Sequence, residues 1–590
     1  MSIRANLIFP FKRIQTAHTS IAFFCLAAML FCAEVRAQPI GQVDTAGSTW
    51  CEMQWECSNA GPMLAIDTLS GNVYFVWTYA PDWPWQDHRE TYFNCYNPSS
   101  GWVYGHSGLD MFPGEWRHQN HSVMVGGNSG TWLDIQIILG SLEPAERTMR
   151  VWWDGRQFQS GELVLDSFPS VDEYVPNCAY SRNGAIQILA GGYDFMLYYG
   201  RVNCRRPEPN EFSGWEMVDT VAGGNYVVAA SPVSDRVVIS YLRQRDFSEE
   251  GHPWYDKDVY LVLSSDGLEW NWAGSTNITD FGEADPLRPV EDNDAAIDYS
   301  DNTHIVFTVM GAKINRGFPE STLVDPFMSF IFHWSSATDS FSLAADGLIA
   351  DVTGHICIFP SCALAVGKPQ LAVNPANGYL YMLYERNRFE DCSFWCFANT
   401  DLWVSVSTDN GLNWSVGTNI TDTQTPGCNG DCASEIEASL YEVVNDTLHL
   451  AYILDTEAGY SQFPYNGGIT ESKVIYQRVP ANLISTTPLL RQFSIREGPP
   501  RCRYIPGDIN GDSLKNGVDV TYAVRFLKGY GAPPVDSCSC SGMPTPFYAA
   551  GDVNGNCQFN GVDISYYVAY LKGQGPLLCY CQNCVPCRLE

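Results

Sequence analysis

The sequence predicts a mainly β protein that ends in a small α-helical module. Short strand patterns recur through residues 38–497, with little helical periodicity between them. Two 12-residue segments rich in Asp and Asn follow, at 508–519 and 552–563, and each precedes an amphipathic helix of about three turns. Because strand repeats of about 40–50 residues are typical of a β-propeller, we expect six or seven blades followed by paired loop–helix units.

The first 37 residues have the features of a secretory signal peptide. Basic residues Arg4 and Lys12 precede an apolar run, Ile21–Cys32, and Ala37 provides a small residue at the cleavage position. The run of about 12 residues is too short to span a bilayer, and no later stretch is long enough. We therefore expect an exported protein without a transmembrane segment, either secreted or associated with the cell surface.

Composition indicates a folded and strongly acidic protein. The chain has 590 residues, a formal net charge of −32 and 13% aromatic residues. This length predicts two to four domains, and the aromatic content excludes a disordered chain. The negative charge argues against a nucleic-acid partner, whose phosphates require Lys and Arg.

The repeated strand pair is clearest at 64–77 and 371–384, where apolar alternation flanks a Ser-Gly or Asn-Gly turn. Weaker copies lie at 123–138, 179–191, 228–241, 296–307 and 438–452. Ring closure of such units removes exposed sheet edges, which suits an extracellular protein.

A sharper element follows two of these pairs. Ser407, Asp409, Gly411 and Trp414 match the pattern Ser-x-Asp-x-Gly-x-x-Trp, and the copy around Asp266 is one residue shorter. The two aspartates are 143 residues apart, which fits three units of about 48 residues. In this pattern Ser and Asp bond the turn backbone, Gly permits the tight bend and Trp packs between sheets. The pattern is the Asp-box, and the region resembles sialidase-like propellers, in which Asp-boxes are structural.

That resemblance implies a catalytic set that the sequence does not supply. A sialidase-like mechanism requires an arginine cluster, a Tyr nucleophile with a Glu partner, and an acid/base carboxylate. The Arg-Ile-Pro motif of the family is absent after Gln38. Arg182, Arg288, Arg386 and Arg388 are candidates to line a central pocket, with ordinary ion pairs as the alternative. No catalytic residue is predicted, and a non-catalytic propeller is favoured over an exo-acting glycoside hydrolase.

The two acidic segments have the spacing of 12-residue calcium loops. Oxygen-bearing side chains occupy loop positions 1, 3, 5, 9 and 12, and position 7 offers its backbone carbonyl. Calcium is a hard cation that takes six to eight oxygens, so two Ca²⁺ sites are predicted. Their ligands are Asp508, Asn510, Asp512, Leu514, Asn516 and Asp519 in the first loop, and Asp552, Asn554, Asn556, Gln558, Asn560 and Asp563 in the second.

Each loop leads into a helix with one apolar face. Apolar residues recur at i, i+3, i+4 and i+7, and each helix ends in Lys-Gly, which favours a left-handed cap. The apolar positions are Val520, Ala523, Val524 and Leu527 in the first helix, and Ile564, Tyr567, Val568 and Leu571 in the second.

Residues 503–576 therefore resemble a type I dockerin, with Asp rather than Glu at loop position 12. The resemblance implies that this module docks onto a cohesin domain of a scaffold or cell-surface protein, often in polysaccharide breakdown. Ser513 and Cys557 replace the usual Gly at position 6, which predicts backbone strain. Asn556 replaces a charged ligand and should weaken the second site. Gly-Val pairs at 517–518 and 561–562 stand where cohesin-binding dockerins often carry polar residues.

Cysteines are numerous, and export makes disulfides the expected state. Of 21 cysteines, removal of the signal leaves 19, an odd number. Close pairs suggest small loop closures at Cys51/Cys57, Cys357/Cys362, Cys392/Cys396 and Cys428/Cys432. The C-terminal cysteines, Cys579, Cys581, Cys584 and Cys587, could suggest a zinc site. In an exported protein, disulfides between them and Cys502, Cys538, Cys540 or Cys557 are favoured instead.

The predicted organisation is a signal peptide (1–37), a propeller (38–497), a linker (498–505), a dockerin-like module (506–576) and a Cys-rich tail (577–590). The expected function is calcium-dependent docking of a propeller that binds glycans or proteins, linked to extracellular polysaccharide metabolism. The alternative is a sialidase-like glycoside hydrolase carried on the docking module. A carbohydrate is the expected ligand class of the propeller, on fold analogy.

Overall fold

The computed structural model describes residues 38–586 with gaps in the loops, and the predicted signal peptide lies outside the described residues. The gaps are 53, 55–61, 83–88, 112–117, 127–133, 142–147, 155–161, 170–176, 192–195, 204–210, 221, 246–255, 283–284, 316–320, 349–356, 358–363, 460–469, 490, 497, 499–500, 503, 535–537, 539–545, 574–576 and 582–583.

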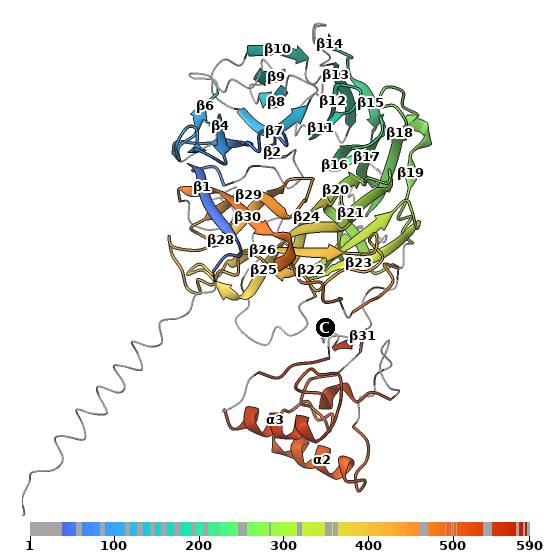
Figure 1. The fold of residues 1–590 in the computed structure, drawn as a ribbon. Helices are drawn as coiled ribbons and strands as arrows, with labels where there is room; N and C mark the ends of the chain where they lie inside the picture. The colour runs from blue at the N-terminus through green and yellow to red at the C-terminus, as the bar shows by residue number, and fades with distance from the viewer. Residues whose placement is uncertain are drawn as a thin grey trace, which may run out of the picture. The chain divides into compact units, whose positions relative to one another are not determined.

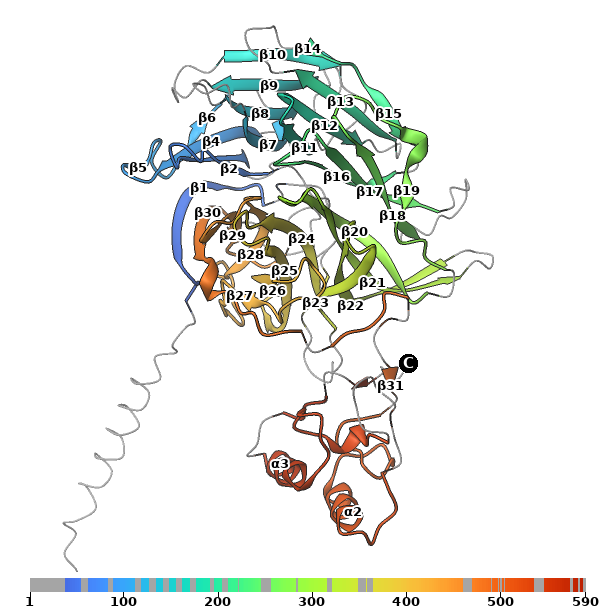
Figure 2. The same ribbon diagram turned by 45° about the vertical axis from the view of Figure 1, so that its right-hand side comes forward.

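The described chain up to residue 480 forms seven antiparallel sheets of four or five strands (Figure 1). The first strand of each sheet contacts the first strand of a neighbouring sheet, so the sheets follow one another around a common centre (Figure 2). These innermost strands are β2, β7, β11, β16, β20, β24 and β28. The expected mainly β propeller is confirmed, and each predicted strand pair is found at the start of one sheet.

Strand bounds in the first three sheets follow the predicted repeats. The strands are β2 (Leu64–Ile66), β3 (Val73–Tyr79), β4 (Glu90–Asn97), β5 (Gly101–Trp102), β6 (Leu109–Asp110); β7 (His118–Gly126), β8 (Asp134–Ser141), β9 (Thr148–Asp154), β10 (Glu162–Pro169); β11 (Asn177–Ser181), β12 (Ala185–Gly191), β13 (Leu197–Asn203), β14 (Glu211–Phe212) and β15 (Glu216–Asp219).

The next three sheets are built in the same order. The strands are β16 (Ala222–Ala230), β17 (Val237–Gln244), β18 (Lys257–Ser264), β19 (Thr276–Asn277); β20 (Leu287–Ile297), β21 (Thr303–Asn315), β22 (Ser321–Ser335), β23 (Ser340–Asp346); β24 (Val366–Val373), β25 (Leu380–Cys392), β26 (Ala398–Ser407) and β27 (Thr418–Asn419).

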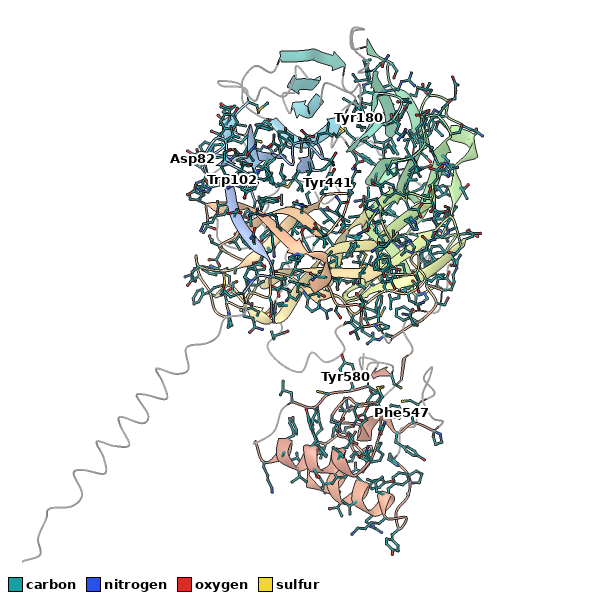
Figure 3. The ribbon with its side chains drawn as sticks, in the orientation of Figure 1. Asp82, Trp102, Tyr180, Tyr441, Phe547 and Tyr580 are labelled. Carbon is teal, nitrogen blue, oxygen red and sulfur yellow. A yellow bond between two sulfur atoms is a disulfide. The ribbon has the colours of Figure 1, made fainter. Side chains whose placement is uncertain are left out.

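The last sheet is assembled from both ends of the propeller. It contains β28 (Ser434–Leu440), β29 (Thr447–Asp455) and β30 (Ser472–Pro480), and its outer strand is β1 (Gln42–Thr49) from the N-terminal end. Because β1 completes the last sheet, the N-terminal and C-terminal ends of the propeller are held together in one sheet. Tyr441, labelled in Figure 3, reaches the first sheet, where its hydroxyl donates to the carbonyl of Ile66 at 3.4 Å.

Apolar side chains fill the spaces between adjacent sheets, which is where the propeller has its core. One cluster joins β17 and β18 to β20–β23 through Leu242, Leu261, Phe307 and Phe332. Gly47 in the closing sheet is needed for such packing, because a Cβ there would lie 2.3 Å from the Trp77 ring.

The Ser-Asp-Gly turns have the predicted hydrogen bonds. Asp266 accepts from the amides of Leu268 and Glu269 at 2.9 and 3.0 Å, and Asp409 accepts from the Asn413 amide at 2.9 Å. These bonds, that from Glu269 foremost, lower the pKa of Asp266. Both aspartates are thus structural, as expected.

Residues 484–496 continue along the propeller after β30. Leu489 donates to the Trp414 carbonyl at 2.8 Å, Arg491 pairs with Asp346 at 3.0 Å, and Arg496 pairs with Asp285 at 3.1 Å. The segment therefore crosses three sheets before the predicted linker begins.

The C-terminal module contains two equal helices, α2 (Gly517–Leu527) and α3 (Gly561–Leu571), at the predicted positions. Three short 3₁₀ turns are also present in the described chain, η1 (Trp272–Gly274), η2 (Ala481–Leu483) and η3 (Ala549–Gly551). A parallel pair of two-residue strands, β31 (Arg501–Cys502) and β32 (Val585–Pro586), joins the two ends of the module. No helix in the described part of the chain is long and apolar enough to cross a membrane.

The module has two small cores. Ala523 and Tyr567 from the two helices pack with Ile509 and Val553 from the two loops. A second cluster includes Phe547 and Tyr580, both labelled in Figure 3, together with Tyr504. Residues on both sides of the predicted 506–576 boundaries therefore belong to this packed unit.

Candidate metal centres in the C-terminal module

The first acidic loop curls around one point through its own backbone amides. Asp519 at position 12 accepts from the amides of Ile509 and Asn516, at 2.9 and 3.0 Å. Asp508 at position 1 accepts from the amide of Ser513 at 2.9 Å. These bonds turn the first and last carboxylates of the loop inward.

Three carboxylates of this loop converge. Single oxygens of Asp508, Asp512 and Asp519 lie within 4.8 Å of one another. Calcium–oxygen distances of about 2.4 Å allow two ligands of one ion to be at most about 4.8 Å apart, so the spacing fits a shared ion. Leu514 is 61% exposed and has no donor side chain, in agreement with a carbonyl ligand at position 7. The donor set is all oxygen, as Ca²⁺ requires.

The second loop repeats the backbone hydrogen bonds to its first and last carboxylates. Asp552 accepts from the Cys557 amide at 2.9 Å, and Asp563 accepts from the Asn560 amide at 2.9 Å. Asn516 and Asn560, at position 9, also cap the two helices by accepting from Val518 and Val562. One side chain thus serves both the loop and the helix start.

The four end carboxylates are buried away from basic side chains of the described residues. Asp508 is 5% exposed, and Asp519, Asp552 and Asp563 are fully buried. None of them has an ion pair among the described residues, and Oδ1 of Asp508 has no hydrogen-bond partner there. Burial, followed by the charge of Asp563, raises the pKa of Asp552 to about 6. Two charges 4.8 Å apart repel by about 3 kcal/mol at an effective dielectric of about 20, so the loops require a counter-charge.

Position 6 is strained in both loops, as predicted. Ser513 and Cys557 adopt left-handed φ values of 67° and 63°, a conformation that favours glycine. The helix-ending glycines Gly529 and Gly573 are also left-handed, at 77° and 65°. The predicted apolar helix faces are partly buried, but Leu527 and Leu571 are 40% and 37% exposed because they end the helices.

A disulfide that the sequence left open holds the second loop. Cys557 at position 6 pairs with Cys581 of the Cys-rich tail, and the Cys579 amide donates to the Val553 carbonyl at 2.8 Å. Asp552, Cys557 and Cys581 lie close together, but the disulfide occupies both sulfurs and removes them as zinc ligands. The tail thus fastens the second loop, and the first loop has no equivalent.

The other predicted cysteine pairs have mixed outcomes. Cys428–Cys432 is confirmed. The pairs Cys357/Cys362 and Cys392/Cys396 are wrong, because Cys357 pairs with Cys392 at the end of β25. Cys396 is left as an exposed free thiol. The pair Cys51/Cys57 is not tested, because Cys57 lies outside the described residues.

The four propeller arginines do not form a cluster. Arg288 is fully buried and bonds Asp256 at 3.0 Å, and Arg388 bonds Asp401 at 2.6 Å. Arg182 donates to the Pro232 carbonyl, and Arg386 lies over the Trp403 ring. Each has its own partner, so the alternative of ordinary ion pairs and surface contacts is the one observed.

A hollow of about 500 Å³ lies beside the shorter Ser-Asp-Gly turn of the propeller. Its lining includes Arg236, Ser264, Glu269, Trp270 and Asn271. An indole, a guanidinium, an amide and hydroxyls in one hollow suit a polar ligand with an apolar face. Sequence reasoning identified the turn but not the hollow, which depends on residues from two sheets.

No protein-family model and no curated protein matches the chain. Among solved structures, a polysaccharide lyase (a PL25 ulvan lyase bound to -[GlcA(1-4)Rha3S]-) is similar, with 12% identity over 72% of this chain and 96% of its own, at a TM-score of 0.41. The α-L-arabinofuranosidase Arb93A of Fusarium graminearum is 12% identical over 61% of this chain and 93% of its own, at a TM-score of 0.34. Sqt1 of Chaetomium thermophilum is 9% identical over 75% of this chain and 99% of its own, at a TM-score of 0.36. Likenesses of this strength carry no argument about activity.

Proposed function

We propose that this protein is an exported, calcium-dependent docking protein whose C-terminal module presents the propeller on a cohesin-like domain of a scaffold or cell surface. The observation that carries the proposal is the pair of matching loops whose four buried end carboxylates have no cation among the described residues. Two Ca²⁺ ions supply the missing charge and fix both helix starts. Calcium is therefore structural, and docking is what the ordered module does.

The exposed side of the helices supports docking. Val518 and Val562 occupy equivalent positions in the first helical turns and are 58% and 62% exposed. Leu527 and Leu571 are exposed at the other ends. Exposed aliphatic side chains at matched positions suit an apolar protein partner better than a polar one.

For the propeller we propose carbohydrate recognition at the hollow around Trp270 and Asn271. Sugar rings have apolar faces that stack on indoles and hydroxyls that bond amides and guanidinium groups. The hollow offers these groups on a rigid scaffold.

The alternative, a glycoside hydrolase, has one observation in its favour. The Thr423 amide donates to Asp401 at 3.2 Å, and the Thr423 hydroxyl donates to Glu435 at 3.0 Å. Burial, followed by the charge of Asp401, raises the pKa of Glu435, while Asp401 accepts from Arg388. A carboxyl group with a raised pKa beside a second carboxylate is typical of acid/base chemistry. Both side chains are at most 2% exposed, however, which keeps substrate away from them and favours binding over catalysis.

Docking is tested with the full chain and a panel of immobilised cohesin-like domains, in calcium and in chelator. We expect calcium-dependent capture, lost in Val518→Asp/Val562→Asp and kept in the exposed control Thr521→Ser. Capture that persists in chelator would contradict the proposal.

The propeller is tested separately by glycan-array binding and by mass spectrometry of released sugar. Binding that Asn271→Ala weakens about tenfold, without sugar release, is expected. Sugar release abolished by Glu435→Gln would establish the enzyme instead.

A further inference from the structure

Two acidic side chains lie buried at the end of β29 in the closing sheet. Asp455 is the last residue of this strand, and Glu457 follows two residues later; their exposed fractions are 0% and 2%. Oδ2 of Asp455 and Oε1 of Glu457 each have no hydrogen-bond partner among the described residues. Two inaccessible carboxylate oxygens are therefore left without a donor, which is costly unless a proton or cation joins them.

The remaining oxygens hold these two carboxylates in place. The Glu457 amide donates to Oδ1 of Asp455 at 2.9 Å, and the Gly430 amide donates to Oε2 of Glu457 at 2.6 Å. Gly430 belongs to the five-residue ring closed by Cys428–Cys432. Asp431 in the same ring is exposed and interacts electrostatically with Glu457. The ring thus contacts Glu457 through Gly430 and brings the charge of Asp431 near it.

No basic side chain neutralises this group. Among the described residues, Asp431, Asp455 and Glu457 have no ion pair with Lys, Arg or His, whereas Asp401 in the neighbouring sheet bonds Arg388 at 2.6 Å. Burial, with a contribution from the charge of Glu457, raises the pKa of Asp455. What distinguishes this group from Asp401 is that two buried carboxylates lie close in the chain and each has an oxygen without a hydrogen-bond partner among the described residues.

We propose that Asp455 and Glu457 hold a third cation site, selective for a hard divalent ion such as Ca²⁺, with Asp431 at its mouth. The two carboxylates offer oxygen donors, which suit Ca²⁺. The site is independent of calcium binding by the C-terminal loops.

Its position gives the ion a structural role. Ser472, which begins β30, pairs with Thr49 of β1, and its hydroxyl lies 3.5 Å from Oδ1 of Asp455. The ion therefore sits where the two ends of the propeller meet. Calcium should stabilise the propeller by bracing this closure, apart from any effect on the C-terminal module.

Calcium content of the full chain tests the site. Asp519→Asn/Asp563→Asn removes a charge from each C-terminal loop, and its calcium content is then measured by equilibrium dialysis and elemental analysis. We expect about one tightly bound calcium per chain to remain. Adding Asp455→Asn/Glu457→Gln should remove it, while adding Glu471→Gln, an exposed acid next to Ser472, should not.

A thermal measurement keeps the test independent of how well the altered loops fold. In the chain with intact loops, calcium should raise the Tm of the propeller transition by about 2 °C or more, and Asp455→Asn/Glu457→Gln should abolish that rise. The proposal is overturned if the loop variant binds no calcium at millimolar concentration, which would indicate a shared proton, or if the calcium survives Asp455→Asn/Glu457→Gln.

Discussion

Buried carboxylates are handled differently in the propeller and in the C-terminal module. In the propeller, Asp401 and Asp256 are almost inaccessible, and each bonds an arginine, Arg388 or Arg288, within 3.0 Å. In the module, Asp519 and Asp563 are fully buried and bond only backbone amides. At these four positions, the same chemical group is paired with an arginine in one region and bonded only to backbone amides in the other.

This difference explains how the two regions are stabilised. The propeller has apolar cores between its sheets and arginine counter-charges at Asp401 and Asp256, so we expect it to fold without the C-terminal calcium ions. The module has small cores and repelling carboxylates, so we expect most of its stability to come from the proposed calcium ions and the tail disulfide. Removal of a counter-charge should strongly lower the stability of both regions. In the propeller the counter-charge is an arginine side chain, and in the module it is the calcium that we propose.

The largest effect of a substitution is expected for Arg388→Met. Removal of this guanidinium leaves Asp401 buried without its cation, which typically costs about 3 kcal/mol in the free energy of unfolding. Urea unfolding followed by tryptophan fluorescence measures the loss.

The variant Arg388→Met/Asp401→Asn serves as the matched control, because it removes both charges. It should recover more than half of the lost stability. Equal losses in the single and double variants would show that packing of the Arg388 stem, and not charge, matters there.

Acid should destabilise the propeller through His449. Burial, followed by the charge of Arg478, lowers the pKa of His449 to about 4, and its Nδ1 lies 2.6 Å from the Tyr476 hydroxyl. The unfolded chain takes up this proton below about pH 6.5 and the folded chain only below about pH 4, so stability falls as the pH drops through that window. A loss of about 2 kcal/mol is expected at pH 5.

His449→Gln keeps a partner for Tyr476 and removes the titration. The difference in unfolding free energy between wild type and variant, measured in saturating calcium from pH 8 to pH 5, should narrow as the pH falls. A difference that is independent of pH would remove His449 from this explanation.

Loss of the Cys557–Cys581 disulfide should weaken calcium binding by the second loop only. The second loop has one carboxylate fewer and depends on the tail, so Cys557→Ser/Cys581→Ser should weaken its calcium affinity about tenfold, or about 1.4 kcal/mol. The first loop should keep its affinity. Calorimetric titration resolves the two sites, and equal weakening of both would contradict the difference between the loops.

The smallest effect concerns the strained position 6 of the first loop. Ser513→Gly removes the cost of a left-handed serine but increases the freedom of the unfolded chain, so a gain of about 0.5 kcal/mol is expected. Ser513→Val should destabilise the module instead, since a β-branched residue tolerates this φ poorly. A Val variant as stable as wild type would mean that the loop relaxes.

Local patterns predicted what is local in this molecule. Apolar alternation, with a Ser-Gly or Asn-Gly turn in the clearest copies, located the first strand pair of every sheet, because neighbouring strands in a hairpin are neighbours in sequence. The spacing of Asp and Asn located both loops, since loop ligands and helix caps are set within 12 residues. Left-handed strain at Ser513 and Cys557 was predictable because only glycine fits that position freely.

Non-local features were beyond the sequence. Nothing in Gln42–Thr49 indicates pairing with Ser472–Pro480, more than 400 residues away. Cys357 was expected to pair with Cys362 because the two are close in sequence, but Cys392 at an adjacent strand end is its partner. Asp455 and Glu457 look like ordinary loop acids in the sequence, which does not reveal the contact of Glu457 with the Cys428–Cys432 ring through Gly430. Each depends on contacts that only the closed ring creates.

The central claim is that calcium is the counter-charge of the C-terminal module. Hydrogen–deuterium exchange of the full chain, in calcium and after chelation, tests it most directly. The account predicts that α2 and α3 lose most of their protection from exchange without calcium. Strands β17, β21 and β25, whose side chains pack between the sheets, should keep theirs. Helices that remain equally protected in chelator would contradict the claim and would mean that the buried carboxylates are neutralised by protons.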